Sequence, residues 1–515
     1  MATETEIKLE LPAAGLAKIA KSPRLRKFQA APRHTDEIVS VYYDTRSCKL
    51  RKRGITLRLR QQGDRRLQTV KADGDAFVAR REWECEIDGD KPDFKAARHT
   101  ALEPLLDKKL RHGLAPLFET RVRRTVLPLR RGKNEIELAR DRGQLHSGRK
   151  TAPISEAELE LKKGDPADLV EVAHALADVA PVRLGGLSKA QRGYRLVEGE
   201  QDQPVKSAPI ALSAEMGAAE GFQAIALACL RQVAANQTAV LAADAEGVHQ
   251  MRIGLRRLRT ALALFGDLVD RDAQTEKMKH ELKWITNELG PARELDVYKR
   301  KSVGPAEGAK PGLRALSRVT ARRVTAALAR AGAAVDSTRY RKLTLDIVGW
   351  LNDGVWLKRS DRLLRSLRAR PLADFAADEL ARRRRKIVKK AKKFDRLDAK
   401  QRHKLRIAAK KLRYGAEFFA KLFDGGKAAK RRIAFAKALK CAQSALGDLN
   451  DIAAHDELAR RLALPRKPRR RGRRPRRRAF AAGFVAGREQ TKIKPLMKSA
   501  RKTLTEFRVL KPFWV

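Results

Sequence analysis

Charged side chains alternate with apolar ones in several short segments of the first 200 residues. These segments lie at residues 4–11, 56–60, 81–87, 134–138 and 156–162. Alternation with a period of two predicts β-strands, in which residues i and i+2 share a face. The charged face of one such strand most often points to water. Several charged strands in one sheet could instead close into a barrel with both signs of charge inside.

The two signs of charge suit different parts of one ligand. Carboxylates without His or Cys nearby favour hard cations such as Mg²⁺ or Mn²⁺. Arg and Lys favour phosphate oxygens, and Arg can make bidentate contacts. A closed charged interior would be costly to bury unless it is wet and filled by a ligand. A phosphate chain complexed with a divalent metal fits both kinds of side chain.

In order along the chain, these segments resemble the motifs of the CYTH family, the triphosphate tunnel metalloenzymes. The family's E-x-E-x-K signature matches Glu4-Thr5-Glu6-Ile7-Lys8. Further matches lie at residues 57–60, 69–71, 82–84, 135–143, 156–162 and 188–192. The resemblance spans roughly residues 1–200. It implies an antiparallel eight-stranded β tunnel with flanking helices that processes triphosphates with a divalent metal.

The same resemblance implies roles for individual side chains. The carboxylates implied to bind metal are Glu4, Glu6, Glu84, Glu137, Asp141, Glu158 and Glu160. The cations implied to hold phosphates are Lys8, Arg58, Arg60, Lys71, Arg121, Arg123 and Lys189. The implied catalytic set is Glu4, Glu6, Lys8, Glu158 and Glu160. Bound Mg²⁺ or Mn²⁺ would neutralise phosphate charge and could activate water, and the identity of the general base stays open.

The chain from about residue 210 onward has a different periodicity and an internal repeat. Its apolar residues recur every three or four positions, which predicts helices. Val248–Phe265 aligns with Arg402–Phe419, with six identities in eighteen positions, and residues 282–290 recur at 439–447. Repeats of this kind indicate a duplicated structural unit.

We therefore predict an α+β multidomain protein. Its domains are the β tunnel at residues 1–200, a polar linker at 201–211 and an all-α domain at 212–515. The all-α domain should contain two pseudo-repeated helical bundles, at about 212–360 and 361–515. The stretch 466–478 holds mostly arginine with interspersed Pro and Gly, which predicts a disordered basic loop.

The repeated helices each carry a row of cations at offsets 0, 3, 7 and 10. The two rows are His249, Arg252, Arg256 and Arg259, and His403, Arg406, Lys410 and Arg413. Such a row falls within about 80° of helix circumference. The common interpretation is a solvated face, but acidic partners at i+4 are nearly absent and the row occurs twice. A row of this kind would gain from an extended polyanion.

This pattern resembles the CHAD family, the conserved-histidine α-helical domains. The matching segments are 249–265, 289–296, 403–419, 446–451 and 511–514. Glu294 stands where the family pattern has Asp. The resemblance covers about residues 210–515. It implies two pseudo-symmetric helical bundles beside a basic pocket that binds inorganic polyphosphate through the two cation rows.

Composition limits the other classes of function. The net charge is +53, of which only +11 lies in residues 1–200, so the helical half implies a polyanionic partner. We expect no membrane span and no secretory leader, because long apolar runs are missing and charges begin at Glu4. The four scattered cysteines favour a reducing cytoplasm, with polyphosphate granules as an open location, over a zinc site or disulfides.

The leading functional hypothesis is a metal-dependent inorganic triphosphatase that hydrolyses tripolyphosphate to diphosphate and phosphate, with a helical domain that binds polyphosphate. Thiamine triphosphatase and adenylate cyclase of the same tunnel class are alternatives, but they need a platform for an organic group, and aromatic residues make up 5% of the chain. A non-catalytic polyphosphate-binding adaptor is another alternative. No motif for specific nucleic-acid binding is found. The oligomeric state stays open.

Overall fold

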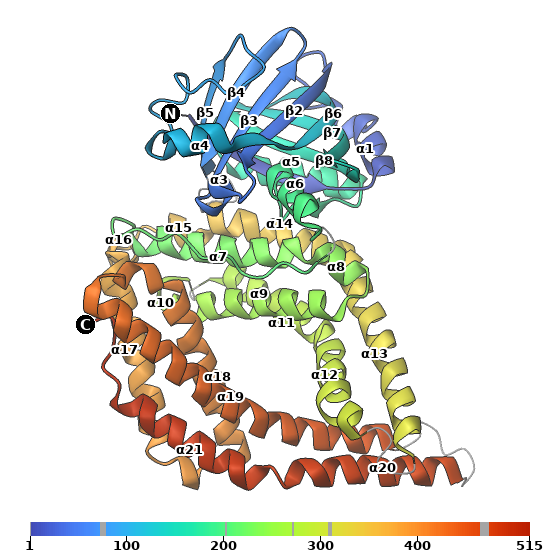
Figure 1. Cartoon of the computed structure of the whole chain (residues 1–515), viewed down its shortest axis with the longest axis vertical. Helices are drawn as coiled ribbons and strands as arrows, with labels where there is room; N and C mark the ends of the chain where they lie inside the picture. The colour runs from blue at the N-terminus through green and yellow to red at the C-terminus, as the bar shows by residue number, and fades with distance from the viewer. Residues whose placement is uncertain (1, 73–78, 201–202, 270–271, 307–311, 464–472) are drawn as a thin grey trace.

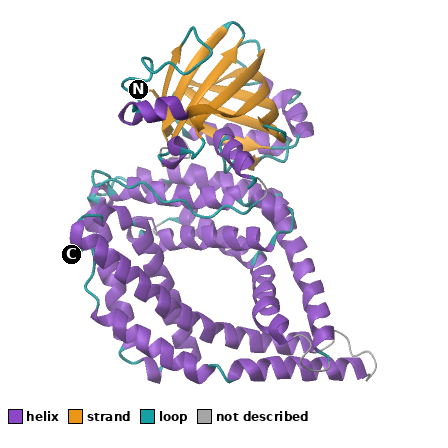
Figure 2. Cartoon of the chain, viewed as in Figure 1, coloured by secondary structure: helices purple, strands orange, loops and turns teal. Residues whose placement is uncertain are grey.

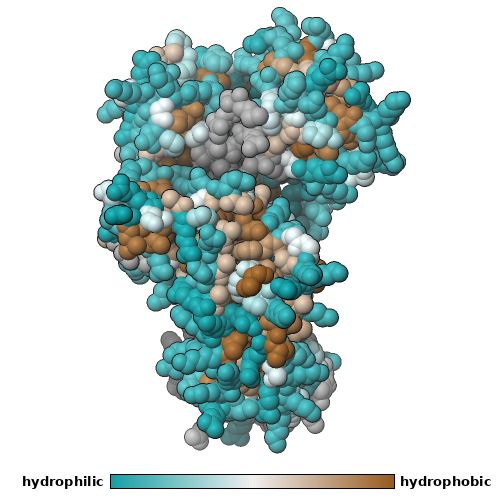
Figure 3. All heavy atoms as spheres, turned by 90° about the vertical axis from the view of Figure 1, so that its left-hand side faces the viewer, coloured by the Kyte–Doolittle hydropathy of each residue, from teal (hydrophilic) through white to brown (hydrophobic). Residues whose placement is uncertain are grey.

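The computed structural model describes residues 2–72, 79–200, 203–269, 272–306, 312–463 and 473–515. A β-rich region occupies the first 200 residues and sits on a helical region formed by the rest of the chain (Figures 1 and 2). The face shown in Figure 3 is mostly hydrophilic, with apolar side chains in scattered patches. The α+β architecture predicted from the two periodicities is therefore confirmed.

The strands close into an antiparallel barrel. They are β1 (Ala2–Glu10), β2 (His34–Thr45), β3 (Ile55–Gln62), β4 (Arg65–Ala72), β5 (Ala79–Glu86), β6 (Leu114–Arg131), β7 (Asn134–Ser147), β8 (Lys150–Lys163) and β9 (Arg183–Leu184). The order is β5-β4-β3-β2-β6-β7-β8-β1, and β1 also pairs with β5 and closes the ring. The eight expected strands form this ring, and the two-residue β9 adds to it by pairing with β1.

Helices cover the apolar outer face of the barrel. They are α1 (Ala13–Ala20), α2 (Pro23–Arg26), α3 (Lys49–Lys52), α4 (Lys108–Gly113) and α5 (Ala167–Val179). The helix α6 (Lys189–Glu198) instead packs against the tunnel-facing side of the barrel, where Tyr194 shares a core cluster with Tyr42 and Val122. On β1, Ile7 and Leu9 are 2% and 0% exposed and join one core cluster with Leu169 and Leu176 of α5. Because neighbours on a strand face opposite ways, burying these residues outside turns Glu6 and Lys8 inward.

The helical region follows an extended segment that ends before α7. Its helices are α7 (Ala218–Ala235), α8 (Gln237–Leu241), α9 (Ala245–Leu264), α10 (Gly266–Val269), α11 (Ala273–Glu288), α12 (Gly290–Tyr298), α13 (Leu313–Asp336), α14 (Thr338–Asp353), α15 (Val355–Lys358), α16 (Arg362–Ala369), α17 (Leu372–Ala391), α18 (Ala399–Phe418), α19 (Gly426–Ala463), α20 (Arg473–Gln490) and α21 (Ile493–Val509). The α9 and α18 helices contain the two aligned repeats and contact each other.

One difference between the repeats lies in the helix that follows the aligned segments. In the first repeat, α11 ends at Glu288 and α12 begins at Gly290, with Pro291 in its first turn. In the second repeat, α19 continues through the equivalent Gly447 as one helix of 38 residues. Proline suits a helix start and is unfavourable inside a helix, so the single Gly-Pro pair accounts for the break.

One sequence expectation needs correction, while the expected absence of a membrane span stays a prediction. The stretch Ala218–Leu241 is long and apolar enough to cross a membrane by length and composition alone, although 67% of its apolar window is buried inside the structure. The expected loop at 466–478 is partly helical, since residues 473–478 belong to α20. The rest of that loop lies outside the described residues.

Candidate active site and cation rows

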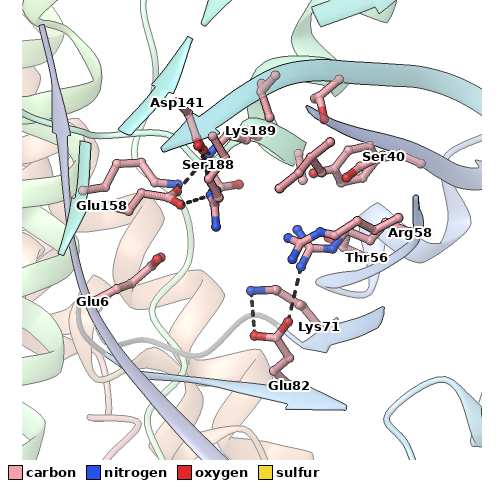
Figure 4. A pocket seen from close by; sticks show the side chains of 18 of the residues that line it. Glu6, Ser40, Thr56, Arg58, Lys71, Glu82, Asp141, Glu158, Ser188 and Lys189 are labelled. Carbon is pink, nitrogen blue, oxygen red and sulfur yellow. Dashed lines mark hydrogen bonds and ion pairs between the residues drawn. The ribbon is translucent and has the colours of Figure 1, made fainter. Parts of the chain in front are cut away.

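The barrel encloses a polar cavity of about 380 Å³ that is lined from β1 through β8 and by the start of α6 (Figure 4). Most of the predicted site residues line it: Glu6, Lys8, Arg58, Arg60, Lys71, Glu84, Glu137, Asp141, Glu158, Glu160 and Lys189. The side chain of Glu4 lies outside the described part of the structure. Opposite charges from separate strands thus meet in one tunnel.

One wall of the tunnel holds a compact carboxylate cluster, formed by Asp141, Glu156 and Glu158, that contains ligand oxygens within 4.8 Å of one another. Lys189 Nζ lies 2.6 Å from Asp141 Oδ2 and 3.0 Å from Glu158 Oε1, and it also contacts Glu156. Lys8 Nζ lies 2.8 Å from Glu158 Oε1. Cations therefore already contact every member of this cluster.

These contacts keep the cluster ionised. Burial alone would raise the pKa of Glu158, but Lys189, Lys8 and Arg124 outweigh it and hold that pKa well below its ordinary value. Burial would likewise raise the pKa of Asp141, and Lys189 and Arg124 lower it. The pKa of Lys189 is raised in turn, because the carboxylates outweigh the effect of burial.

The start of α6 fixes Lys189. Ser188 caps this helix, accepting a hydrogen bond from the Gln191 backbone at 3.2 Å, while the Gln191 side chain accepts one from the Ser188 backbone at 3.0 Å. This reciprocal pair is a capping box. Lys189 is the first residue after the cap, so the local sequence sets where its side chain enters the tunnel.

The opposite wall is basic. Arg58 Nη2 lies 3.4 Å from Glu82 Oε1, and Lys71 Nζ lies 2.8 Å from Glu82 Oε2 (Figure 4). The buried Nε of Arg60, like that of Arg58, has no hydrogen-bond partner. Repulsion from Arg58, then burial and repulsion from Arg124, lower the pKa of Arg60 to about 10. An anion beside Arg60 would relieve that repulsion.

A second set of carboxylates crosses three adjacent strands. The register places Glu6 of β1 opposite Glu160 of β8, and Glu160 opposite Glu137 of β7. All three line the tunnel. Lys162 Nζ lies 2.7 Å from Glu160 Oε1 and 3.9 Å from Glu137 Oε2. We call these three side chains the carboxylate row.

The prediction that Arg121 and Arg123 face the tunnel is wrong. Their side chains are 65% and 70% exposed, and they pair with Glu119 and Glu37 outside the barrel. Arg124 faces inward instead, with Nη2 at 2.7 Å from Asp141 Oδ2 and 2.6 Å from Glu158 Oε2.

Sequence reasoning also missed four lining or supporting residues, which are Glu82, Arg124, Glu156 and Arg192. Glu82 and Glu156 each lie two positions from a predicted carboxylate, so strand alternation already placed them on the same face. Arg192 Nη1 lies 3.5 Å from Glu156 Oε2, one turn after Lys189 on α6, and only the folded position of that helix reveals it.

The predicted cation rows lie on α9 and α18 and face each other. Burial, together with repulsion from Arg256 of α9, lowers the pKa values of both Arg406 and Lys410 of α18. Arg252 Nη1 donates to the Thr286 carbonyl at 2.8 Å. Arg413 Nε donates to Gln443 Oε1 at 2.7 Å. The two repeats therefore bring their cations into one electrostatic environment.

Acidic groups balance these cations only in part, through Glu417 at 2.5 Å from Arg413 Nη1 and Asp451 at 3.8 Å from Arg406 Nη2. Burial, followed by repulsion from Arg256 and Arg406, lowers the pKa of Lys410 to about 7. Burial and neighbouring arginines lower the pKa of Arg252 to about 10 and that of His249 to about 4. In the tunnel, by contrast, carboxylates raise the pKa values of Lys8 and Lys189 above those of free lysine.

Comparison with known proteins agrees with this division. The CYTH domain family matches residues 2–194, and the CHAD domain family matches residues 224–460. An inorganic triphosphatase from Haemophilus influenzae is 29% identical over 194 residues, which cover 37% of this chain and 54% of that protein. The match thus spans about half the length of that relative.

The helical region is similar to a solved structure. The crystal structure of the CHAD domain from the plant Ricinus communis is 29% identical and has a TM-score of 0.51. The likeness covers 59% of this chain and 96% of the plant domain. The chain consists of a CYTH domain followed by a CHAD domain.

Proposed function

We propose that the CYTH domain is a metal-dependent inorganic triphosphatase that hydrolyses tripolyphosphate to diphosphate and phosphate. The observation that carries this proposal is the pairing, inside one cavity, of the carboxylate row with the incompletely neutralised Arg60. A ligand that satisfies both must carry negative charge and a cation. A metal-complexed phosphate chain does so. The triphosphatase from Haemophilus influenzae supports the same reaction class.

Mg²⁺ or Mn²⁺ fits the carboxylate row better than the compact cluster. The three carboxylates of the cluster contact four cations, which are Lys8, Arg124, Lys189 and Arg192. A divalent ion would have to displace them. In the row, Lys162 pairs with Glu160 and Glu137, and the three carboxylates offer hard oxygen ligands. A metal held there would neutralise phosphate oxygens and polarise the bond to be cleaved.

The protein's own groups account for binding and proton transfer. Arg58, Arg60 and Lys71 would hold phosphate oxygens along the basic wall. A carboxylate of the row would accept a proton as water attacks the terminal phosphorus. The phosphorus–oxygen bond to the next phosphate would then break, with release of phosphate and diphosphate. Lys8 and Lys189 keep the opposite cluster ionised and fixed.

The aromatic residues of the tunnel favour an inorganic substrate over a thiamine or adenine triphosphate. Tyr42 and Tyr194 line the cavity but are 3% and 2% exposed. Both pack against Phe118, with ring centroids 4.6 Å and 5.1 Å away. A stacked base or thiazole needs an open ring face, and these rings belong to the wall.

We further propose that the CHAD domain binds inorganic polyphosphate through the two cation rows. The support is the lowered pKa of Arg252, Arg406 and Lys410, which follows from burial and crowding with like charges. A polyanion would relieve that repulsion and release counterions on binding. The polyphosphate and triphosphate sites would thus differ in the charge that they require.

Phosphate release from tripolyphosphate by the full chain tests the enzymatic proposal. We expect activity that depends on Mg²⁺ or Mn²⁺, and a loss of at least about a hundredfold in Glu160→Gln. Glu119→Gln is the matched control, because Glu119 pairs with Arg121 on the outer face of the barrel. Equal or faster turnover of ATP or thiamine triphosphate would contradict the inorganic assignment.

Competition between polyphosphate and duplex DNA tests the second proposal. We expect polyphosphate to be retained preferentially at physiological salt, and Arg252→Ala with Arg406→Ala to weaken its binding. Arg330→Ala is the control, because Arg330 is exposed and its guanidinium pairs with Glu288. Preferential retention of DNA would instead favour a general nucleic-acid binder.

A further inference from the structure

The segment 183–189 contacts both domains. On the barrel side, Arg183 and Leu184 form β9 and pair with β1, and the Gly185 amide donates to the Lys8 carbonyl at 2.8 Å. A methyl group on Gly185 would lie 2.8 Å from Lys8 Cγ, so the Lys8 side chain packs directly over this glycine. The segment then leads into Lys189.

On its other side, the same segment rests on the CHAD domain. Gln237 of α8 is 3% exposed, and its Nε2 donates to the Leu184 carbonyl and to the Ala234 carbonyl, both at 2.9 Å. Gly186 lies so close to the end of α7 that an added Cβ would overlap the backbone of Ala234 and Ala235. Backbone atoms cannot move aside as a flexible side chain can.

The surrounding interface holds the two domains in one arrangement. His174 Nε2 of α5 lies 2.9 Å from Asp346 Oδ1 of α14, and Lys342 Nζ lies 3.0 Å from Asp178 Oδ1. One apolar core cluster continues from the barrel helices into α7 and α14. Figure 1 shows α5 and α6 directly above α14 and α7. The helical domain is therefore a fixed support for the segment.

From these contacts we propose that the CHAD domain positions the tunnel lysines, with Gly186 and Gln237 as the positioning residues. This inference rests on the proposed triphosphatase function. Lys8 is also held within β1 by pairing with β8, whereas Lys189 follows the segment immediately. A shift at Gly186 should therefore act mainly through Lys189, which contacts all three carboxylates of the cluster.

The test is a double-mutant cycle on the full chain. We expect Gly186→Ala to lower kcat/KM for tripolyphosphate by about ten- to a hundredfold, as expected for a displacement of about 1 Å in a binding group. Lys189→Ala should lower it at least as much. The double variant should be no worse than Lys189→Ala alone, because both changes would remove the same interaction. If the losses in kcat/KM of the two single variants multiply in the double variant, the proposal is overturned, because Gly186→Ala would then act through an independent structural effect.

Gly89→Ala is the control, because an added Cβ there meets only a backbone nitrogen at 3.9 Å. If Gly186→Ala does not fold, Gln237→Met supports the same cycle, since it removes the donor and keeps the side-chain length.

Wild-type activity tests the triphosphatase proposal by itself. Were the wild type inactive, calorimetric binding of Mg²⁺-complexed tripolyphosphate would supply the second readout. Equal affinity in wild type and Gln237→Met would then refute the positioning role.

Discussion

Polyphosphate binding should weaken as the pH rises from 7 to 9, because of Lys410. This residue lies on α18 between Arg256, Arg406 and Arg413, with Asp451 as the opposing charge. Burial and the three arginines bring its pKa to about 7 in the free protein. A bound polyanion would favour the ammonium form and return the pKa toward the ordinary value of about 10.4.

The size of the effect follows from proton linkage. For a pKa of about 7, Lys410 of the protein without polyphosphate is about half protonated at pH 7 and about 1% protonated at pH 9. Binding requires the ammonium form, so the protein must take up a proton at the higher pH. Affinity should therefore fall by up to about fiftyfold, or about 2.3 kcal/mol, between these two pH values. The contribution of Lys410 to polyphosphate binding is largest at pH values below its pKa in the unliganded protein, and it is lost as the pH rises above that value.

Calorimetry with a long-chain polyphosphate at constant ionic strength measures this effect. Titrations in buffers of different ionisation enthalpy would count the protons taken up, and we expect nearly one at pH 9. Lys410→Arg should flatten the dependence, because a guanidinium stays charged over this range. Lys404→Arg, on the exposed side of the same helix, should keep the wild-type slope. A flat wild-type profile, or an unchanged slope in Lys410→Arg, would refute the reasoning.

Three further predictions concern the barrel. Arg124→Gln should lower kcat/KM for tripolyphosphate by about a hundredfold, whereas the adjacent, outward-facing Arg123→Gln should change it less than twofold in the same assay. Gly143→Ala should destabilise the protein by about 2 kcal/mol in thermal unfolding, because the new methyl group would overlap the β6 backbone. Lys189 lowers the pKa of Glu158 in the folded state. The pair therefore stabilises the fold at pH values above the pKa that Glu158 has in the unfolded chain. This stabilisation disappears as the pH falls through the lower pKa that Glu158 has in the folded state. Lys189→Met should therefore move the acid-unfolding midpoint, followed by circular dichroism, to higher pH.

Strand alternation predicted most of the tunnel lining, and β6 shows where that reasoning fails. Arg121, Arg123 and Arg124 offer a cation on either face of the strand. The inner face also carries Val122 and Val126, so an apolar residue did not mark the outside. Pairing with β2 and β7 decides which face turns inward, and that information lies in distant segments.

The helical half shows a similar limit. The sequence repeat predicted that α9 and α18 carry equivalent cation rows, because the offsets depend only on helix geometry. The influence of Arg256 on Lys410 depends on how the two helices pack, and no spacing within either repeat encodes it. The helix break at Gly290 was not predicted either, because the difference between a split and a continuous helix rests on Pro291 alone.

The cations of the two domains have opposite surroundings, and this difference affects which ligand each domain would bind. In the tunnel, carboxylates surround Lys8 and Lys189 and raise their pKa values, so bare negative charge gains little there. A ligand gains more when it supplies a cation for the carboxylate row together with phosphates for Arg60. On α9 and α18, burial and crowding with like charges lower the pKa of Arg252 and Lys410, so any closely spaced anion relieves repulsion. The tunnel would therefore select for metal-complexed phosphate, whereas the helical rows would select for density of negative charge.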